Sequence, residues 1–230
     1  MDRKILSIMG VILLLLAFQS CATNPEEGLL KRYFHALSLN DTTTLSTMAL
    51  EPVTIPMKDW EILSVGEENV QAPPALLEMN QKEQELKKSL EDHVGTTLDA
   101  RDELDNAKFD LERARTRAAR RAAQNKVDEL QAKYDEVYEE HKELQKEYNE
   151  AKAAAQREEE ISAFSLGVSD LPNIRDFSGE MRSKIVDIRA ISDEGENDYR
   201  IYLRTYTLKD ETLGITHRGR WIIVKFESLD

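Results

Sequence analysis

Apolar residues recur every three or four positions through a long central stretch of the chain, residues 75–160. One series runs from Leu76 to Ala118 and a second from Val127 to Ala155, and each keeps heptad spacing. This spacing is typical of helices that pack along a shared seam. Proline is absent from the stretch and Gly95 is its only glycine. The pattern therefore predicts an α-helical coiled coil.

The two heptad series are out of phase, because a heptad continued from Ala118 reaches Asn125 and not Val127. One unbroken helix has no need of such a slip, whereas the two arms of a helical hairpin set their registers independently. We therefore expect a hairpin whose turn lies within residues 117–126, with Asn125 as the cap of the second arm. Arms of about 35 to 45 residues are roughly 50 to 65 Å long.

The segments on either side of this stretch predict a small α+β domain. Asn24 and Pro25 mark the start of a helix that reaches Leu39, and Asp41 caps a second, short helix. A short strand covers residues 60–65. Three runs rich in β-branched and aromatic residues follow the coiled coil and predict an antiparallel meander. Their ranges are 184–191, 199–208 and 220–229, joined by a turn at 193–198 and a mobile loop at 209–219.

The fold class that these patterns predict is α+β, a helix on an antiparallel sheet with a long inserted coiled-coil hairpin. Four segments follow from it. They are a signal peptide at 1–20, the first part of the α+β domain at 21–74, the hairpin at 75–160 and the β-meander at 161–230.

The N-terminus carries a run of 14 apolar residues, Ile5 to Phe18, followed closely by Cys21, the only cysteine. The run is shorter than the roughly 20 residues that cross a bilayer as a helix, and it is typical of a secretory signal. The segment resembles a bacterial lipoprotein signal. That resemblance implies cleavage before Cys21, diacylation of its thiol and, because Ala22 follows, the periplasmic face of the outer membrane. An ordinary cleaved signal and an uncleaved anchor are the alternatives.

Short motifs on both sides of the central stretch resemble the nuclear transport factor two-like superfamily, whose fold is a cystatin-like cone. They are Tyr33-Phe34-His35-Ala36-Leu37, then Asp41 and Leu45, and finally Gly219-Arg220-Trp221-Ile222-Ile223. More narrowly, the chain resembles bacterial lipoproteins of unknown function that carry this domain. The resemblance covers residues 25–70 and about 165–230 and implies a cone interrupted by the coiled coil. Because the fold hosts enzymes, ligand cups and scaffolds, it assigns no activity.

Composition excludes several classes of function. The 230 residues carry a net charge of −13, and loss of residues 1–20 removes one acid and two bases and leaves −14. An acidic chain argues against nucleic-acid binding. A single cysteine excludes an intrachain disulfide and a cysteine zinc cluster. No two of the four histidines have metal-ligand spacing, and the sequence shows no Ser/His/Asp order, no Gly-rich phosphate loop and no EF-hand loop. We therefore predict no metal, no cofactor and no catalytic residue.

One group of bases departs from the acidic background and falls near the predicted turn. Its members are Arg113, Arg115, Arg117, Arg120, Arg121 and Lys126, with Glu112, directly before them, as the single acid that they face. The group predicts a docking tip for an anionic partner in the envelope, such as lipid head groups, an acidic wall polymer or an acidic protein. The alternative is that these bases balance the acidic arms and keep the turn soluble.

Two further sets of residues are candidates for chemistry. His93 and His141 fall on core positions of opposite arms, where they either form a pH-sensitive seam or fill the core imperfectly. His35, Tyr33 and Trp60 are the candidate pocket of the cone. An open pocket around His35 with several carboxylates favours an enzyme. A cavity filled by Phe34, Leu37, Trp60 and Trp221 favours a scaffold.

The function that these expectations favour is a membrane-anchored envelope lipoprotein, a non-enzymatic binding or scaffolding module with a projecting coiled-coil arm. One alternative is a subunit resembling the periplasmic adaptors of envelope transport complexes. Against it, the segments that flank the predicted hairpin lack the glycine-rich half-motifs of the adaptors' lipoyl domains. The other is a small enzyme that uses the cone as an active-site cup. The identity of the partner and the oligomeric state stay open.

Overall fold

The computed structural model describes residues 24–55, 57–168 and 171–229. The predicted signal peptide and Cys21 lie outside these residues. The fold is α+β, as predicted: four α-helices accompany a six-stranded antiparallel sheet in the described residues. The chain divides into two compact units. Unit 1 comprises the described residues up to 69 with 182–205 and 220–229, and unit 2 comprises 70–181 and 206–219.

Two helices of unit 1 match the expected start of the domain. Helix α2 spans Pro25–Ser38 and helix α3 spans Thr42–Met48. The carboxylate of Asp41 accepts a 3.1 Å hydrogen bond from the amide of Thr44 and so caps α3, as predicted. One face of α2 is buried, and its residues recur at helical spacing: Glu26, Leu29, Leu30, Tyr33, Phe34, Ala36 and Leu37.

The strands of unit 1 form an antiparallel sheet against this helical face. Strand β1 (Asp59–Val65) pairs with β3 (Ser178–Ser192), and β6 (Ile222–Ser228) pairs with β4 (Gly195–Asp210). The short strand β2 (Asn69–Gln71), of which only Asn69 belongs to unit 1, pairs with β3. Alternate strand residues join the helices in one core, whose members from the sheet are Val186, Ile188, Ala190, Ile201, Leu203 and Ile223.

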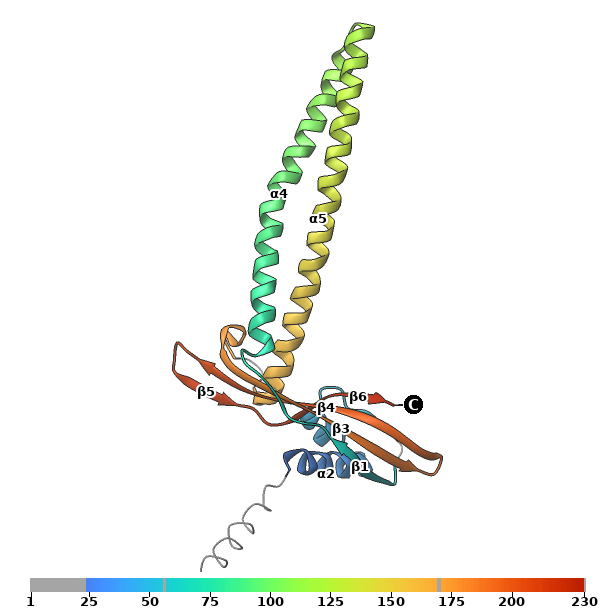
Figure 1. The fold of residues 1–230 in the computed structure, drawn as a ribbon, viewed down its shortest axis with the longest axis vertical. Helices are drawn as coiled ribbons and strands as arrows, with labels where there is room; N and C mark the ends of the chain where they lie inside the picture. Colours follow the sequence, from blue (N-terminus) through green and yellow to red (C-terminus); the bar gives the residue numbers. More distant parts are fainter. Residues whose placement is uncertain (1–23, 56, 169–170, 230) are drawn as a thin grey trace, which may run out of the picture. The chain divides into compact units, whose positions relative to one another are not determined.

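Two long packed helices dominate unit 2. Helix α4 spans Ala75–Arg113, helix α5 spans Arg117–Leu166, and the two lie side by side (Figure 1). Every member of the two heptad series except Ala118 is buried or half-buried, as expected for positions at which two helices pack against each other. At the end near the connection, the seam contains a cluster of Leu104, Ala107, Val127 and Leu130 with Leu111 and Tyr134 packed against it.

The sequence predicted a mobile loop at 209–219, but part of this range is a strand in unit 2. Strand β5 (Ile215–Arg218) lies in this range and pairs with the end of β4 from Thr207 to Asp210. At Gly219, a side-chain Cβ would lie 2.3 Å from Oγ of Ser165, so this close approach requires glycine. A 3₁₀ turn at Ile174–Asp176 precedes β3 and also belongs to unit 2.

The predicted boundaries of the insertion, 75 and 160, do not coincide with the division into units. Helix α5 continues to Leu166 and ends at Gly167, whose left-handed backbone (φ 71°) is a common way to end a helix. Ile161, Ser162 and Ser165 in this last part are buried. Unit 2 therefore contains more than the two long helices: it also includes the start of β3 (residues 178–181), the end of β4 (residues 206–210) and β5.

Candidate functional site

The tip of the helix pair is formed by the last residue of α4, the first turns of α5 and the connection between them. This connection is only three residues long, 114–116. It lies immediately before the predicted window, 117–126. The reason is that Thr116 and not Asn125 caps α5: its Oγ1 accepts a 3.1 Å hydrogen bond from the amide of Ala119. Asn125 lies inside α5.

The structure brings the six predicted bases together at or beside this tip. All six are exposed. Lys126 pairs with Glu129 at 3.1 Å, whereas no ion pair is present at any of the five arginines in the described part of the chain. The guanidinium of Arg113 lies 3.9 Å from the ring centre of Phe109, whose side chain is 49% exposed.

The arginines at the start of α5 occupy an electrostatically unfavourable position. The first turn of α5 contains no acidic residue, although the partial positive charge at a helix N-terminus favours acids there. Arg117, Arg120 and Arg121 therefore add positive charge to the positive end of the helix dipole. An anion bound at the tip would relieve this repulsion, so the tip is suited to bind anions.

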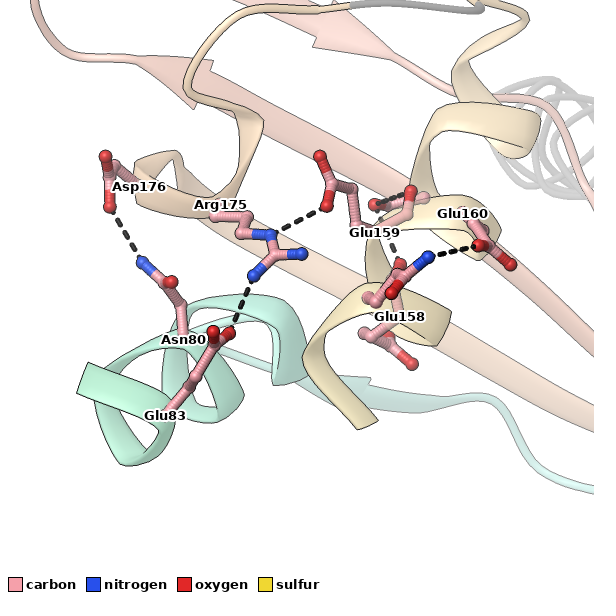
Figure 2. Close-up of polar contacts among 9 residues, drawn as sticks. Asn80, Glu83, Glu158, Glu159, Glu160, Arg175 and Asp176 are labelled. Atoms are coloured by element: carbon pink, nitrogen blue, oxygen red, sulfur yellow. Dashed lines mark hydrogen bonds and ion pairs between the residues drawn. The ribbon is translucent and has the colours of Figure 1, made fainter. Parts of the chain in front are cut away.

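A second polar cluster joins the two long helices near their other end, and sequence reasoning did not find it. Arg175, in the 3₁₀ turn, donates hydrogen bonds of 2.7 Å to Glu83 of α4 and to Glu159 of α5 (Figure 2). Burial acts to lower the pKa of Arg175, but Glu159 and Glu83 outweigh it and raise that pKa above its usual value. Glu83, a buried member of the first heptad series, is therefore paired with Arg175.

A neighbouring hydrogen bond extends this cluster. The amide of Asn80 donates to the carboxylate of Asp176 at 2.9 Å, from α4 to the 3₁₀ turn (Figure 2). Asn80 and Glu83 are buried members of α4. Because Arg175 and Asn80 each donate to acceptors on another element of unit 2, the cluster holds the base of the helix pair together.

The two histidines, which the heptads place on core positions of opposite arms, lie against each other. The rings of His93 and His141 stack with centroids 5.9 Å apart and planes 14° apart. Nε2 of His93 lies 3.1 Å from the carbonyl oxygen of Val137. Nδ1 of His141 is buried and has no hydrogen-bond partner. The pair belongs to the packed seam.

The structure does not bring the three candidate pocket residues of the cone together. Tyr33 is buried in the core; its hydroxyl accepts a 3.0 Å hydrogen bond from the amide of Val53, and burial raises the pKa of the phenol. Trp60 packs on Phe34 with ring centres 4.7 Å apart. His35 lies on the exposed face of α2 and lines a separate surface groove.

This groove lies between α2, α3 and the residues that precede β6, and has a volume of about 900 Å³. Sequence reasoning missed it because Arg220 and Trp221 approach α2 only in the folded chain. In the described residues, no cluster of three or more His, Cys, Asp or Glu side chains could hold a metal ion. None of the helices in the described ranges is long and apolar enough to cross a membrane.

Comparison with known proteins identifies no relative: no family model matches this chain, and no curated protein or solved structure shows significant similarity to it.

Proposed function

We propose that this protein is a bacterial envelope lipoprotein, anchored through Cys21, that acts as a non-enzymatic binding or scaffolding module. In this proposal the two long helices form a coiled-coil arm, and the arm presents the arginine tip to an anionic envelope partner. The observation that carries the proposal is a set of five exposed arginines at the end of the helix pair, none of which forms an ion pair with another described residue. The 39 residues of α4 make the pair about 58 Å long.

The interior of unit 1 supports a scaffold over an enzyme. Phe34 and Leu37 are buried, and Trp60 and Trp221 pack against the same core. A core filled in this way favours a scaffold. In this proposal, unit 1 is the main part of a cystatin-like cone whose interior is occupied by its own side chains.

The chemistry of the tip favours phosphate groups in the partner. Five of its six bases are arginine, and the planar guanidinium matches phosphate with two parallel hydrogen bonds. The net charge of −14 after residue 20 repels polyanions elsewhere on the chain. A phosphate-bearing polymer is therefore expected to bind at the tip and to do so less tightly as salt screens the charges.

Titration with soluble polyanions tests this proposal. The variant Arg115→Gln/Arg117→Gln/Arg120→Gln/Arg121→Gln keeps good helix formers and is compared with the parent for binding of polyphosphate and of polyglutamate over a range of salt concentrations. The parent is expected to bind polyphosphate more tightly, and the variant to lose at least tenfold in affinity with a smaller salt dependence.

A matched variant controls for the change in total charge. Lys82, Lys88, Lys146 and Lys152 are exposed on the same two helices, away from the tip, and replacing them with glutamine removes the same number of charges. This control is expected to keep nearly the parent affinity. Equal losses in the two variants, or no loss in the tip variant, would refute docking at the tip.

A further inference from the structure

The surface groove of unit 1 has an apolar floor. Leu29, Ala36 and Met48 are buried at its base, and Trp221 is half-buried along it. Leu39 at the end of α2 also lines the groove and is 64% exposed. A groove of about 900 Å³ with such a lining is suited to hydrocarbon.

The rim of the same groove is cationic. Arg32 lies on α2, where its Nε donates a 3.3 Å hydrogen bond to the carbonyl of Gly28. Arg220 approaches from before β6 and donates to the carbonyl of Thr47 at 2.9 Å. Asp41 is the one carboxylate among the described lining residues. Its oxygens accept hydrogen bonds from the amide and hydroxyl of Thr44, which lower the pKa of the carboxyl.

Gly28 leaves open space beside α2 along the groove. It lies within α2 and lines the groove, and a Cβ built on it would meet no atom within 4 Å. Glycine is a poor helix former, and neither packing nor a left-handed backbone requires it at this position. The close approach of a ligand to the helix would require it.

The position of the groove along the chain indicates the source of the ligand. Asn24 and Pro25 line one end of it, and Asn24 follows Cys21 by three residues, a distance of about 10 Å when extended. If Cys21 is acylated as proposed above, the groove is tethered close to the head-group layer. Tryptophan and arginine are typical of protein surfaces at that depth.

We propose that this groove binds an anionic phospholipid of the membrane to which the chain is tethered. The phosphate binds Arg32 and Arg220, and the acyl chain begins along Leu39 and Trp221. An anion without a hydrocarbon chain leaves the apolar floor exposed to water, and a zwitterionic lipid brings a positive charge to the two guanidinium groups. The inference rests on the proposed lipid anchor, which gives the source of the ligand. The residues that bind the lipid in the groove do not include the tip arginines.

Binding of monomeric short-chain lipids tests the proposal in solution. The chain from residue 21 onward, with Cys21→Ser and with the four tip arginines replaced by glutamine, is titrated with dihexanoyl phosphatidylglycerol, dihexanoyl phosphatidylcholine and inorganic phosphate by calorimetry. Phosphatidylglycerol is expected to bind at least tenfold more tightly than the other two. A brominated acyl chain is expected to quench the fluorescence of Trp221, and Trp221→Phe should remove that quenching.

Two variants separate binding from folding. Arg32→Gln/Arg220→Gln should weaken phosphatidylglycerol binding at least tenfold, whereas Lys31→Gln/Lys225→Gln, exposed and outside the groove, should not. Gly28→Leu should block binding while the melting temperature stays level or rises, because leucine fills open space and favours the helix.

Each contrary result has a distinct meaning. Equal affinity for the two lipids, unchanged binding in Arg32→Gln/Arg220→Gln, or binding of phosphate as tight as that of lipid would overturn the assignment. A failure of the polyanion titration at the tip would leave this result standing, because the tip arginines are absent from the protein used here.

Discussion

The phenol of Tyr206 donates a 2.6 Å hydrogen bond to Oε1 of Glu158, and both side chains are buried within unit 2. Tyr206 belongs to β4 and Glu158 to the last turns of α5. A buried carboxylate is costly unless donors satisfy it. The hydrogen bond therefore ties the base of α5 to the sheet and fixes where the long helix meets the strands.

Removing this donor should destabilise unit 2. Tyr206→Phe is expected to lower the free energy of unfolding by about 1–3 kcal/mol, because it deprives a buried carboxylate of a partner. Denaturation in urea measures the change. Tyr202→Phe is the matched control: its phenol also donates at 2.6 Å, to Glu227, but from a half-exposed site. Equal losses would contradict a special role for the buried pair.

The helix pair should tolerate shortening at its tip end but not at its base. His93 lies opposite His141, so joining Leu90 to Leu144 through a short Gly/Ser turn cuts both helices at one level. This variant keeps Glu83, Glu158 and Glu159 and should retain a cooperative melt by circular dichroism. Deleting residues 75–160 removes those partners of Arg175 and Tyr206 and should destabilise the rest. Equal melting temperatures of the two deletion variants would refute this prediction.

Replacing the stacked histidines with leucine should stabilise the helix pair. Nδ1 of His141 is buried without a partner, a state that costs about 1–3 kcal/mol, and both residues occupy heptad core positions where leucine packs well. We expect His93→Leu/His141→Leu to raise the free energy of unfolding at pH 7 by an amount within that range. A lower stability would show that the ring stack contributes more than the unpaired nitrogen costs.

The free energy of unfolding of unit 1 should fall in acid, because of an ion pair on the outer face of its sheet. Two hydrogen bonds from Arg200 to Asp187, of 2.8 and 3.1 Å, lower the pKa of this carboxyl, with help from Ser64. A lowered folded pKa stabilises the fold above the unfolded value of about 4, and the gain disappears as the pH falls through the folded value.

Asp187→Asn should therefore reduce stability at pH 7 and flatten its decline below about pH 4. Urea unfolding at a series of pH values measures both effects. Glu67→Gln, at an exposed residue without an ion pair among the described residues, is the control and should leave the decline unchanged. A parent and an Asp187→Asn variant with parallel pH profiles would contradict the prediction.

Periodicity predicted the elements whose pattern is local and repeated. The heptads located the seam, and Asp41 located the start of α3, because caps and seams depend on neighbouring residues. The turn was placed too late, since Thr116 competes with Asn125 as a cap and only the packed register decides between them. Strand β5 was missed because its four residues become a strand only by pairing with β4.

Side-chain surroundings could be predicted only where the alternation of a strand persists. Ile201 and Leu203 are buried in unit 1, whereas Tyr206 and Leu208 are buried in unit 2, so the buried parity of β4 changes between them. Alternation continued from the half-buried Tyr202 would place Tyr206 on the same face, whereas Tyr206 is fully buried. The groove at His35 depends on Trp221, and the ion pair of Glu83 depends on Arg175. Both partners are distant in sequence, so no local pattern predicts either contact.

The lipid on Cys21 is the claim on which the proposed localisation and tethered function both depend. Mass spectrometry of the protein extracted from membranes of a producing bacterium tests it most directly. We expect a chain that begins at Cys21 and carries a diacylglyceryl group on the thiol, and we expect Cys21→Ser to abolish this species. A chain with an intact Met1, or one cleaved elsewhere with an unmodified thiol at residue 21, would contradict it.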